Sequence, residues 1–376
     1  MILPGATLGV LGGGQLGRMF CGAARTMGYR TVVLDPDTRS PAGVIADTHI
    51  CAAYDDATAL QRMAADCDAI TTEFENVPAA SLQFLAKLKP VHPAAACVQI
   101  AQNRIAEKNF ARGIGISPAL FYEVRQVSDL EAACAVTGLP AILKTATLGY
   151  DGKGQQVVNT LQQAQEAFRN MGAVVCVLEK RLELKMEISA LLARNARGEV
   201  QCYPPAENEH RNGVLQQSIV PARVNPKIAE QAQASAIKLA NAMNYIGVLA
   251  VEFFITTNDE LIFNEMSPRP HNSGHYTQDA AVTSQFEQQV RVMCGLPPGD
   301  ARLISPAVMV NLLGDLWHPD WTALLSEPNA KLHLYGKDAA RPGRKMGHYN
   351  VLASTIEQAI VVADRIFSAL ETRQQG

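Results

Sequence analysis

Residues 248–280 read VLAVEFFITTNDELIFNEMSPRPHNSGHYTQDA, and this stretch decides more about the fold than any other. Two runs rich in β-branched and aromatic residues flank the polar segment TTNDE. This pattern predicts a β-hairpin that turns near Asn258 and Asp259. A turn centred there places Glu252 directly opposite Glu265 on the neighbouring strand.

The same register places Phe254 opposite Phe263, and it brings two like charges together across a strand pair, where they repel each other. Glu252 also interrupts an otherwise apolar strand. Two converging carboxylates suit a hard divalent cation, and Mg²⁺ typically takes one or two carboxylates together with substrate phosphates. The pattern therefore predicts a metal site at Glu252 and Glu265, unless the register slips by one residue and directs each glutamate to water.

A polar, cationic loop follows the hairpin. Arg269, His271 and Asn272 stand in SPRPHNSGH, where two prolines restrict the backbone. Such a loop beside a metal site is suited to hold an anionic substrate and to stabilise developing charge. Histidines that only cap a turn are the alternative interpretation.

A second cationic segment lies near the C-terminal end. RPGRKMGHYN, residues 341–350, contains Arg344 and Lys345 between glycines. Together with Lys337 these side chains form either a clamp for a phosphate group or a solvated loop.

A glycine-rich loop, TATLGYDGKGQ at residues 145–155, directly follows the apolar strand AILK. Gly149, Gly152 and Gly154 make the loop flexible, and its backbone N–H groups can wrap a polyphosphate. Lys144 ends the strand, where a lone ammonium group is costly without a partner such as a phosphate oxygen. A surface turn with an extended lysine side chain is the alternative.

The segment VVCVLEKRLELKMEISALLAR, residues 174–194, is read as two successive strands with a few residues that cross over between them. Glu179 ends one strand, and Glu187 lies in the next. A crossover of this kind between domains offers backbone groups to an adenine ring and a carboxylate to ribose hydroxyls. An ordinary hairpin with solvated charges is the alternative.

The N-terminal part carries a G-x-G-x-x-G fingerprint at Gly12, Gly14 and Gly17, within GVLGGGQLGRM. A strand precedes it and a helix follows, with Phe20 and Ala24 on the apolar face of that helix. The next strand, TVVLD, ends at Asp35, where a dinucleotide-binding fold keeps its ribose-binding acid. These residues alone are compatible with an NAD site.

The strand and helix pattern divides the chain into three parts. Residues 1–112 alternate TLGVLG, TVVLD and DAITTEFE with helical stretches, which predicts parallel strands in βαβ units. Residues 113–300 contain closely spaced strands, which favours antiparallel pairing, and one clear helix over 227–243. Residues 301–376 contain short strands and a final helix, with Ser354 and Glu357 as its capping box.

Composition excludes several classes of protein. The formal net charge of the 376 residues is −3, and no basic run is present, which argues against nucleic acid as the main partner. The eight cysteines contain no C-x-x-C pair, which fits reduced thiols in a cytoplasm. Pro4 and Gly5 interrupt the N-terminal apolar run, and no apolar run approaches the roughly 20 residues of a membrane helix. We therefore expect a soluble, cytoplasmic protein.

Taken together, these motifs resemble the ATP-grasp enzymes, and within that superfamily the N5-carboxyaminoimidazole ribonucleotide synthetases. The resemblance covers essentially the whole chain. It is carried by these stretches: GGGQLGRM, TTEFENVP, QNRIAEKNF, LKTATLGYDGKGQ, ENEHRNGVLQQSIVPA, NEMSPRPHNSGHYTQDA and LYGKDAARPGRKMGHYN. It implies an ATP-grasp fold of mixed α/β and α+β class. An N-terminal Rossmann-like domain (1–112), an ATP-grasp domain (113–300, with a lid at about 120–185) and a small C-terminal β-rich domain (301–376) would make up this fold.

The resemblance also assigns the site residues. It implies ATP binding by Arg104, Lys144, Gly149, Tyr150, Asp151, Gly152, Lys153, Gly154, Gln155, Glu179, Lys180, Arg181, Leu182, Glu187, His210, Asn264 and Glu265. It implies ribonucleotide binding by Gln15, Leu16, Glu73, Tyr150, Asp151, Arg269, His271, Asn272, Lys337, Arg344 and Lys345. Catalysis would rest on Lys144, Arg269, His271 and Asn272, and Mg²⁺, or Mn²⁺ in its place, would bind Glu252 and Glu265. Many ATP-grasp enzymes have an asparagine where this sequence has Ser267, which puts a third protein ligand in doubt.

The implied reaction carboxylates 5-aminoimidazole ribonucleotide with bicarbonate and ATP, through carboxyphosphate, in purine biosynthesis by a homodimer. In this family the N-terminal glycines lie near the ribonucleotide and hold no dinucleotide. Another ATP-grasp ligase, such as a formate-using glycinamide ribonucleotide transformylase, is the nearest alternative, although ENEHRNG and RPGRKMGHYN favour the carboxylase. An NAD-dependent dehydrogenase needs neither the paired glutamates nor the second glycine loop. A non-catalytic nucleotide-binding scaffold does not explain why all the charged site residues are present.

Overall fold

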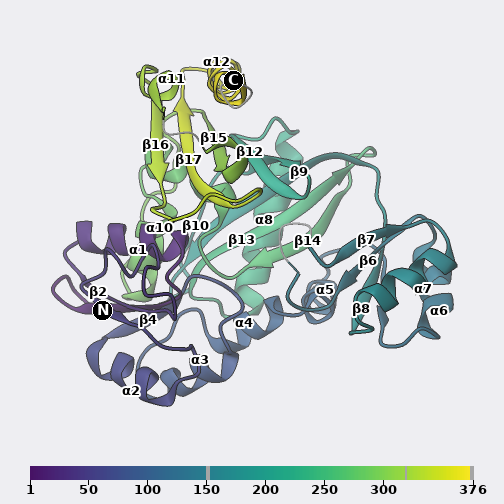
Figure 1. The fold of residues 1–376 in the computed structure, drawn as a ribbon, viewed down its shortest axis with the longest axis horizontal. Helices are drawn as coiled ribbons and strands as arrows, with labels where there is room; N and C mark the ends of the chain where they lie inside the picture. Colours follow the sequence, from purple (N-terminus) through teal and green to yellow (C-terminus); the bar gives the residue numbers. More distant parts are fainter. Residues whose placement is uncertain (150–152, 318–319, 373–376) are drawn as a thin grey trace.

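The computed structural model describes residues 1–149, 153–317 and 320–372, and in these residues the strands form three sheets (Figure 1). The strands are β1 Thr7–Leu11, β2 Arg30–Leu34, β3 Thr48–Ile50, β4 Ala69–Thr72, β5 Phe121–Val124, β6 Ala141–Thr145, β7 Gln155–Val158, β8 Cys176–Lys180, β9 Leu184–Arg194, β10 Val200–Cys202, β11 Ala206–Arg211, β12 Val214–Val220, β13 Gly247–Thr256, β14 Leu261–Ser267, β15 Ala307–Leu313, β16 Ala330–Leu334 and β17 Lys345–Leu352. The helices are α1 Gln15–Thr26, α2 Ala57–Asp66, α3 Ala79–Ala86, α4 Ala95–Ala101, α5 Arg104–Gly113, α6 Asp129–Thr137, α7 Leu161–Asn170, α8 Pro226–Ala242, α9 Thr277–Ala280, α10 Gln285–Met293, α11 Thr322–Leu325 and α12 Ile356–Thr372, with short 3₁₀ turns at η1 Asn272–Gly274 and η2 Gly314–Leu316.

The N-terminal sheet is parallel, in the order β3-β2-β1-β4, which confirms the predicted βαβ arrangement of residues 7–11, 30–34 and 69–72. Its strands are apolar because both faces are covered. One apolar cluster joins the sheet to α1 and α10, and another joins it to α2, α3 and α4. The helix after the glycine loop is α1, which buries Phe20 and Ala24 and ends before Gly28, whose φ of +85° favours glycine.

The second sheet is small and antiparallel, in the order β5-β8-β6-β7, and α6 and α7 pack on it at the right of Figure 1. Strand β8 belongs to this sheet, whereas β9 belongs to the large sheet described next. The segment from Glu179 to Glu187 therefore crosses from one sheet to another. The predicted crossover is confirmed, and the interpretation as an ordinary hairpin is wrong.

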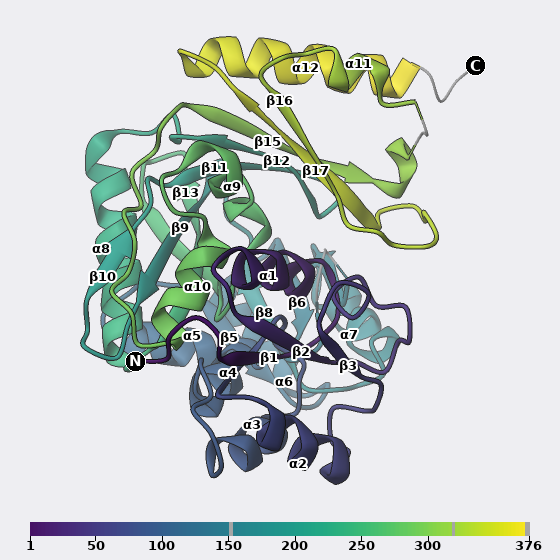
Figure 2. The same cartoon turned by 90° about the vertical axis from the view of Figure 1, so that its left-hand side faces the viewer.

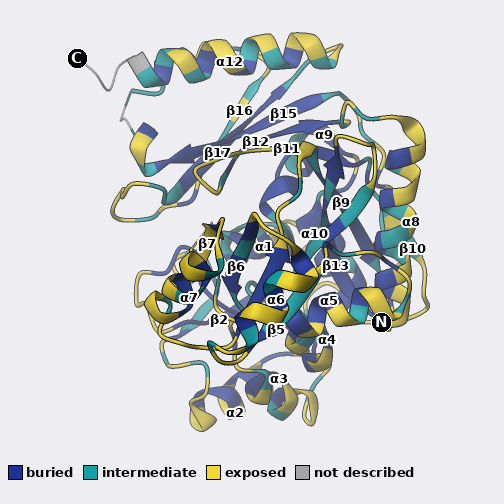
Figure 3. Ribbon diagram, turned by 90° about the vertical axis from the view of Figure 1, so that its right-hand side faces the viewer, coloured by how far each residue is buried: buried dark blue, intermediate teal, exposed yellow. Residues whose placement is uncertain are grey.

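The third sheet has nine antiparallel strands, in the order β14-β13-β9-β11-β12-β15-β17-β16, with β10 beside β9. Helix α8 packs on β9 and β13 through one apolar cluster, and α12 covers β15 and β17 through another (Figure 2). The C-terminal strands therefore extend the central sheet, because β15 pairs with β12 and covers the edge that β12 would otherwise expose. Figure 3 shows the resulting contrast between buried strands and the exposed outer face of α12.

Two local predictions are wrong by one residue. The register of β13 and β14 shifts at a bulge between Glu252 and Phe253, so Phe253, and not Phe254, lies opposite Phe263. At the start of α12, the Thr355 hydroxyl, and not Ser354, accepts a hydrogen bond from the backbone N–H of Gln358 at 3.3 Å. A bulge adds a residue that alternation cannot reveal, and adjacent Ser and Thr are both suitable cap residues, so the sequence does not show which one is used.

None of the helices in the described part of the chain has the length and apolar character that a bilayer-spanning helix needs.

Candidate active site

A cavity of about 590 Å³ is lined by residues from the N-terminal part of the chain (residues 1–112), the small antiparallel sheet and the large sheet. The structure brings these predicted site residues together in its lining: Gln15, Leu16, Glu73, Arg104, Lys144, Gly149, Gln155, Glu187, His210, Glu252, Asn264, Glu265, Arg269, His271, Asn272 and Lys345. These predicted residues are described but do not line it: Lys153, Gly154, Glu179, Lys180, Arg181, Leu182, Lys337 and Arg344. The predictions for Tyr150, Asp151 and Gly152 lie outside the described residues.

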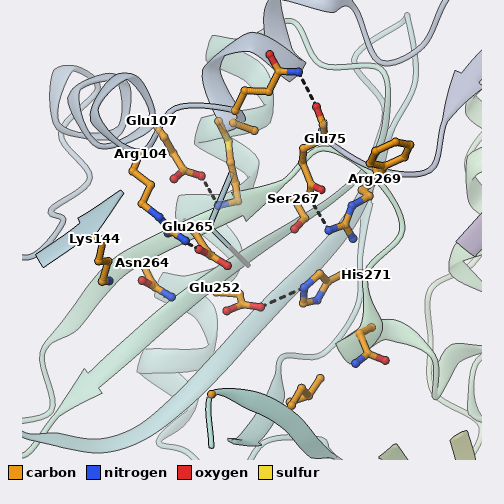
Figure 4. A pocket seen from close by; sticks show the side chains of 18 of the residues that line it. Glu75, Arg104, Glu107, Lys144, Glu252, Asn264, Glu265, Ser267, Arg269 and His271 are labelled. Atoms are coloured by element: carbon orange, nitrogen blue, oxygen red, sulfur yellow. Dashed lines mark hydrogen bonds and ion pairs between the residues drawn. The ribbon is translucent and has the colours of Figure 1, made fainter. Parts of the chain in front are cut away.

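The paired carboxylates lie on neighbouring strands of the large sheet (Figure 4). Glu252 and Glu265 are direct partners in the register of β13 and β14, so the predicted pairing is confirmed and the slipped register is wrong. Arg104 donates to Glu265 Oε2 at 2.7 Å, and His271 Nε2 lies 3.1 Å from Glu252 Oε1. Each carboxylate therefore has its own partner, on opposite sides of the pair.

The surroundings shift the pKa values of the two carboxyl groups in opposite directions. Burial and the charge of Glu265 raise the pKa of Glu252 to about 7. Burial opposes ionisation of Glu265 as well, but the Arg104 guanidinium, together with the charges of Lys144 and Lys108, outweighs it and lowers the pKa of Glu265. One member of the pair is therefore held ionised, as is usual for two acids that share a small space.

The donor set fits a hard divalent cation that a phosphate group completes. Two carboxylates offer hard oxygen ligands, and Asn264, next to Glu265, also lines the cavity. Among the described residues, no cluster of three or more His, Cys, Asp or Glu side chains has metal-binding geometry. A cation here would thus take its other ligands from water and from a bound phosphate.

The loop after β14 brings polar groups to the same cavity. Arg269 Nη2 lies 2.5 Å from Glu75 Oε1. Burial and the charge of Arg269 lower the pKa of His271 well below its usual range, which keeps its imidazole neutral. The amide oxygen and nitrogen of Asn272 are buried, and neither has a hydrogen-bond partner among the described residues. An unpaired buried amide at a cavity wall is suited to bind a polar ligand.

The cavity lining also includes Lys144, Glu187 and His210. Lys144 donates to Glu179 Oε2 at 2.9 Å, so its partner in this structure is a carboxylate. Glu187 lines the cavity and lies 3.1 Å from His210 Nδ1. Although burial opposes protonation of His210, the Glu187 carboxylate raises its pKa. Of the two crossover glutamates, only Glu187 faces the cavity.

Sequence reasoning missed three residues around this site: Glu75, Glu107 and Lys108. Glu107 Oε1 accepts a hydrogen bond from the backbone N–H of Met266 at 2.5 Å, and Lys108 Nζ donates to the Asn264 carbonyl at 3.2 Å. Both are buried and lie on α5 with Arg104. Positions 104, 107 and 108 share one face of a helix. Three charged residues on a helix face that packs against the protein indicate a functional site, and this pattern could have identified them from the sequence.

The glycines at the start of α1 leave room for the side chain of Glu73. Its carboxylate accepts hydrogen bonds from the backbone N–H groups of Gly14 and, at 2.6 Å, of Gly17. A Cβ at Gly14 would lie 2.5 Å from Glu73 Oε1. The helix N-terminus that would bind pyrophosphate in a dinucleotide fold thus already holds an acidic side chain. Asp35, the expected ribose acid, instead accepts from the Gly13 N–H at 2.6 Å.

Replacing Glu73 with glutamine is expected to destabilise the chain by about 1–3 kcal/mol, because the amide NH₂ would face one of the two N–H donors and leave it unpaired. Urea unfolding of the full chain would measure this change. Asp66→Asn is the control: it removes the charge from an exposed ion pair with Arg62, and should cost less than about 1 kcal/mol. Equal stability of the Glu73 and Asp66 variants would show that the carboxylate is not needed to hold the loop.

Comparison with known protein families gives matches to three domains that together span most of the chain. The family descriptions that match are a ribonucleotide synthetase preATP-grasp domain over residues 5–102, an ATP-grasp domain over 109–286 and a phosphoribosylaminoimidazole carboxylase C-terminal domain over 307–361. The fold and site thus define the class of protein: the chain is an ATP-grasp ligase.

The relatives narrow this class. The N5-carboxyaminoimidazole ribonucleotide synthase of Bacillus subtilis is 45% identical over 351 residues, which are 93% of this chain and 92% of the relative. A crystal structure of such a synthetase with ADP has a TM-score of 0.93 at 42% identity, covering 100% of this chain and 99% of that one. The Aspergillus clavatus synthase in complex with ADP and 5-aminoimidazole ribonucleotide has a TM-score of 0.89 at 31% identity, covering 98% and 99%. The chain belongs to the N5-carboxyaminoimidazole ribonucleotide synthase family, whose ATP-binding ligases act in purine biosynthesis.

Proposed function

We propose that this chain joins bicarbonate to the exocyclic amine of 5-aminoimidazole ribonucleotide and converts ATP to ADP and phosphate. The observation that carries this proposal is the pairing of Glu252 and Glu265 in the same cavity as Arg269, His271 and Asn272. A site for metal-bound ATP and a site for an anionic acceptor therefore share one space. Membership of the synthase family supports the choice of acceptor.

We assign the nucleotide to the side of the cavity formed by β6, the crossover and β14. Lys144 would hold a phosphate group, and Glu187 would accept from the ribose hydroxyls. The glycine loop of residues 145–155 would cover the phosphates and exclude water. Glu252 and Glu265 would hold Mg²⁺, or Mn²⁺ in its place, and the bound ion would neutralise charge on the transferred phosphoryl group.

The chemistry follows in two steps. A bicarbonate oxygen attacks the γ-phosphorus, the bond from that phosphorus to the bridging oxygen of ADP breaks, and carboxyphosphate forms. The amine nitrogen then bonds to the carboxyl carbon and loses a proton, and inorganic phosphate leaves. This second step proceeds either on carboxyphosphate itself or on CO₂ that it releases. Lys144 would stabilise charge in the first step and Arg269 in the second, and proximity in the closed cavity would supply much of the rate.

We assign the ribonucleotide to the other side of the cavity. Gln15, Leu16 and Glu73 line the cavity together with Arg269 and Lys345. Lys345 would contact the phosphate of the substrate. Lys337 donates to the Lys345 carbonyl at 2.7 Å and Arg344 donates to the Ala339 carbonyl at 2.7 Å, so for these two we infer a supporting role in that loop.

We also infer, from the family resemblance, a homodimer of cytoplasmic chains and the three segments 1–112, 113–300 and 301–376. The eight cysteines are all unpaired in the structure, which fits a reducing compartment.

The test is ADP release from the purified chain with ATP, Mg²⁺ and bicarbonate, with and without 5-aminoimidazole ribonucleotide. Strong stimulation by the ribonucleotide, with equimolar carboxylated product, is the expected result. ADP release that ignores this ribonucleotide but responds to formate and glycinamide ribonucleotide would favour the transformylase. Absence of turnover with either acceptor, together with tight NADH binding, would favour a dehydrogenase.

A further inference from the structure

A buried cluster of three charged side chains lies beside the cavity: Lys108 on α5, Lys144 on β6 and Glu179 on β8. Lys144 Nζ lies 2.9 Å from Glu179 Oε2, and Lys108 Nζ lies 3.2 Å from Glu179 Oε1. The side chains of Lys108, Lys144 and Glu179 are 1%, 8% and 3% exposed. Two lysines therefore share one carboxylate in a place where water screens their charges little.

The two lysines differ in what else they reach. Lys144 lines the cavity, whereas Lys108 is not among the described residues that do. Lys108 instead donates to the Asn264 carbonyl at 3.2 Å, which ties it to β14 of the large sheet. Lys108 is thus fixed behind the site, between the small sheet that carries Glu179 and the strand that carries Glu265.

The charge of the cluster exceeds what Glu179 needs. One ammonium group would neutralise this carboxylate. Burial lowers the pKa of Lys108, but the Glu179 carboxylate opposes this shift, and a second ammonium group there leaves the cluster with one positive charge in excess. The two ammonium groups outweigh the cost of burial and lower the pKa of Glu179 to about 2, so the carboxylate is ionised at neutral pH. The neighbouring pair of Arg104 and Glu265 is neutral as a whole. Burial raises the pKa of nearby Glu107 well above its usual range, so neither this carboxyl group nor that pair cancels the excess.

We propose that Lys108 is a positioning residue for ATP: it supplies the charge that Glu179 requires, so that the charge of Lys144 is available to a phosphate group. This inference rests on the proposed role of Lys144 in ATP binding. Without Lys108, the buried carboxylate would depend on Lys144 alone, and ATP would have to compete with Glu179 for that ammonium group. A buried ion is costly to leave unpaired, so the competition would favour Glu179.

The test compares the affinity of full-length variants for a non-hydrolysable ATP analogue with Mg²⁺, measured by calorimetry. Lys108→Met should weaken binding by about tenfold or more, because the cluster loses its excess charge. Adding Glu179→Gln to Lys108→Met restores the excess charge, and binding should return to within about threefold of the parent chain. Lys185→Met is the matched control, since Lys185 forms an exposed pair with Asp259 and should leave affinity unchanged.

If Lys108 only fills space, the double variant should bind as weakly as Lys108→Met or more weakly, and that result would overturn the proposal. A second comparison covers the case in which Lys108→Met does not fold. Lys108→Met/Glu179→Gln and Lys144→Met/Glu179→Gln carry the same net charge, but only the first should bind the analogue like the parent chain. Equally weak binding of the analogue by these two double variants would also overturn the proposal.

Lys144→Met separates this inference from the proposed function. If Lys144→Met binds the analogue as the parent does, the phosphate role of Lys144 is wrong and the inference falls with it. If Lys144→Met binds weakly but Glu179→Gln does not rescue Lys108→Met, the phosphate role stands and only the inference fails.

Discussion

Replacing Glu265 with glutamine is expected to lower the rate of ribonucleotide-stimulated ADP release by at least about 10²–10³-fold, the size of effect seen when one preorganised charge-stabilising group is removed. Glutamine keeps the size of the side chain but removes the charge that Arg104 and the opposing Glu252 face. A divalent cation would lose one of its two carboxylates. Steady-state ADP release across a range of Mg²⁺ concentrations is the measurement.

Glu260→Gln is the matched control, because Glu260 lies in the turn of the same hairpin and is exposed. It should retain the parent rate. An unchanged rate for Glu265→Gln, or equal losses in the two variants, would contradict the assignment of the carboxylate pair to the metal. Partial recovery of Glu265→Gln at high Mg²⁺ would support it, since weaker binding is then compensated by concentration.

Replacing Arg269 with methionine is expected to lower formation of the carboxylated ribonucleotide by about 10²–10³-fold, because the guanidinium that would stabilise the anion in the second step is removed. Arg269 is held beside Glu75 at one end of the cavity, away from the side assigned to the nucleotide. Slow ATP hydrolysis in the presence of bicarbonate should therefore persist. Parallel assays of ADP and of carboxylated product would separate the two steps.

Arg302→Met is the control for this variant, since Arg302 is exposed and its ion pair within the described part of the chain is with nearby Asp300 at 3.4 Å. Arg302→Met should form ADP and the carboxylated ribonucleotide in the same ratio as the parent chain. Loss of ADP release and of carboxylation to the same extent in Arg269→Met would place Arg269 in the first step and contradict its assignment to the second.

Patterns within short stretches of sequence were enough for much of the fold and part of the site. Alternation around TTNDE predicted that Glu252 and Glu265 are cross-strand partners, because a hairpin is closed by residues near in the chain. The antiparallel strands of the middle region and the parallel strands of the first were predicted from spacing alone. Most predicted site residues meet in one cavity, but many of these assignments depended on the family resemblance rather than on any pattern.

Other features depend on contacts between residues far apart in the chain. Local periodicity carries no information about them. Arg104 meets Glu265 across 161 residues, and Glu107 meets the backbone of Met266 across 159. The joining of the C-terminal strands to the central sheet through β12 and β15 is of the same kind.

The sequence by itself thus determined the hairpin, the glycine turn before the first helix and the strand classes, because turn chemistry and side-chain alternation act over a few residues. Only the tertiary structure decided that Glu73 fills the N-terminus of α1 and that Lys108 and Lys144 share Glu179. A buried charge must find its partner wherever the packed chain brings one within reach, and that partner is set by how the three sheets meet.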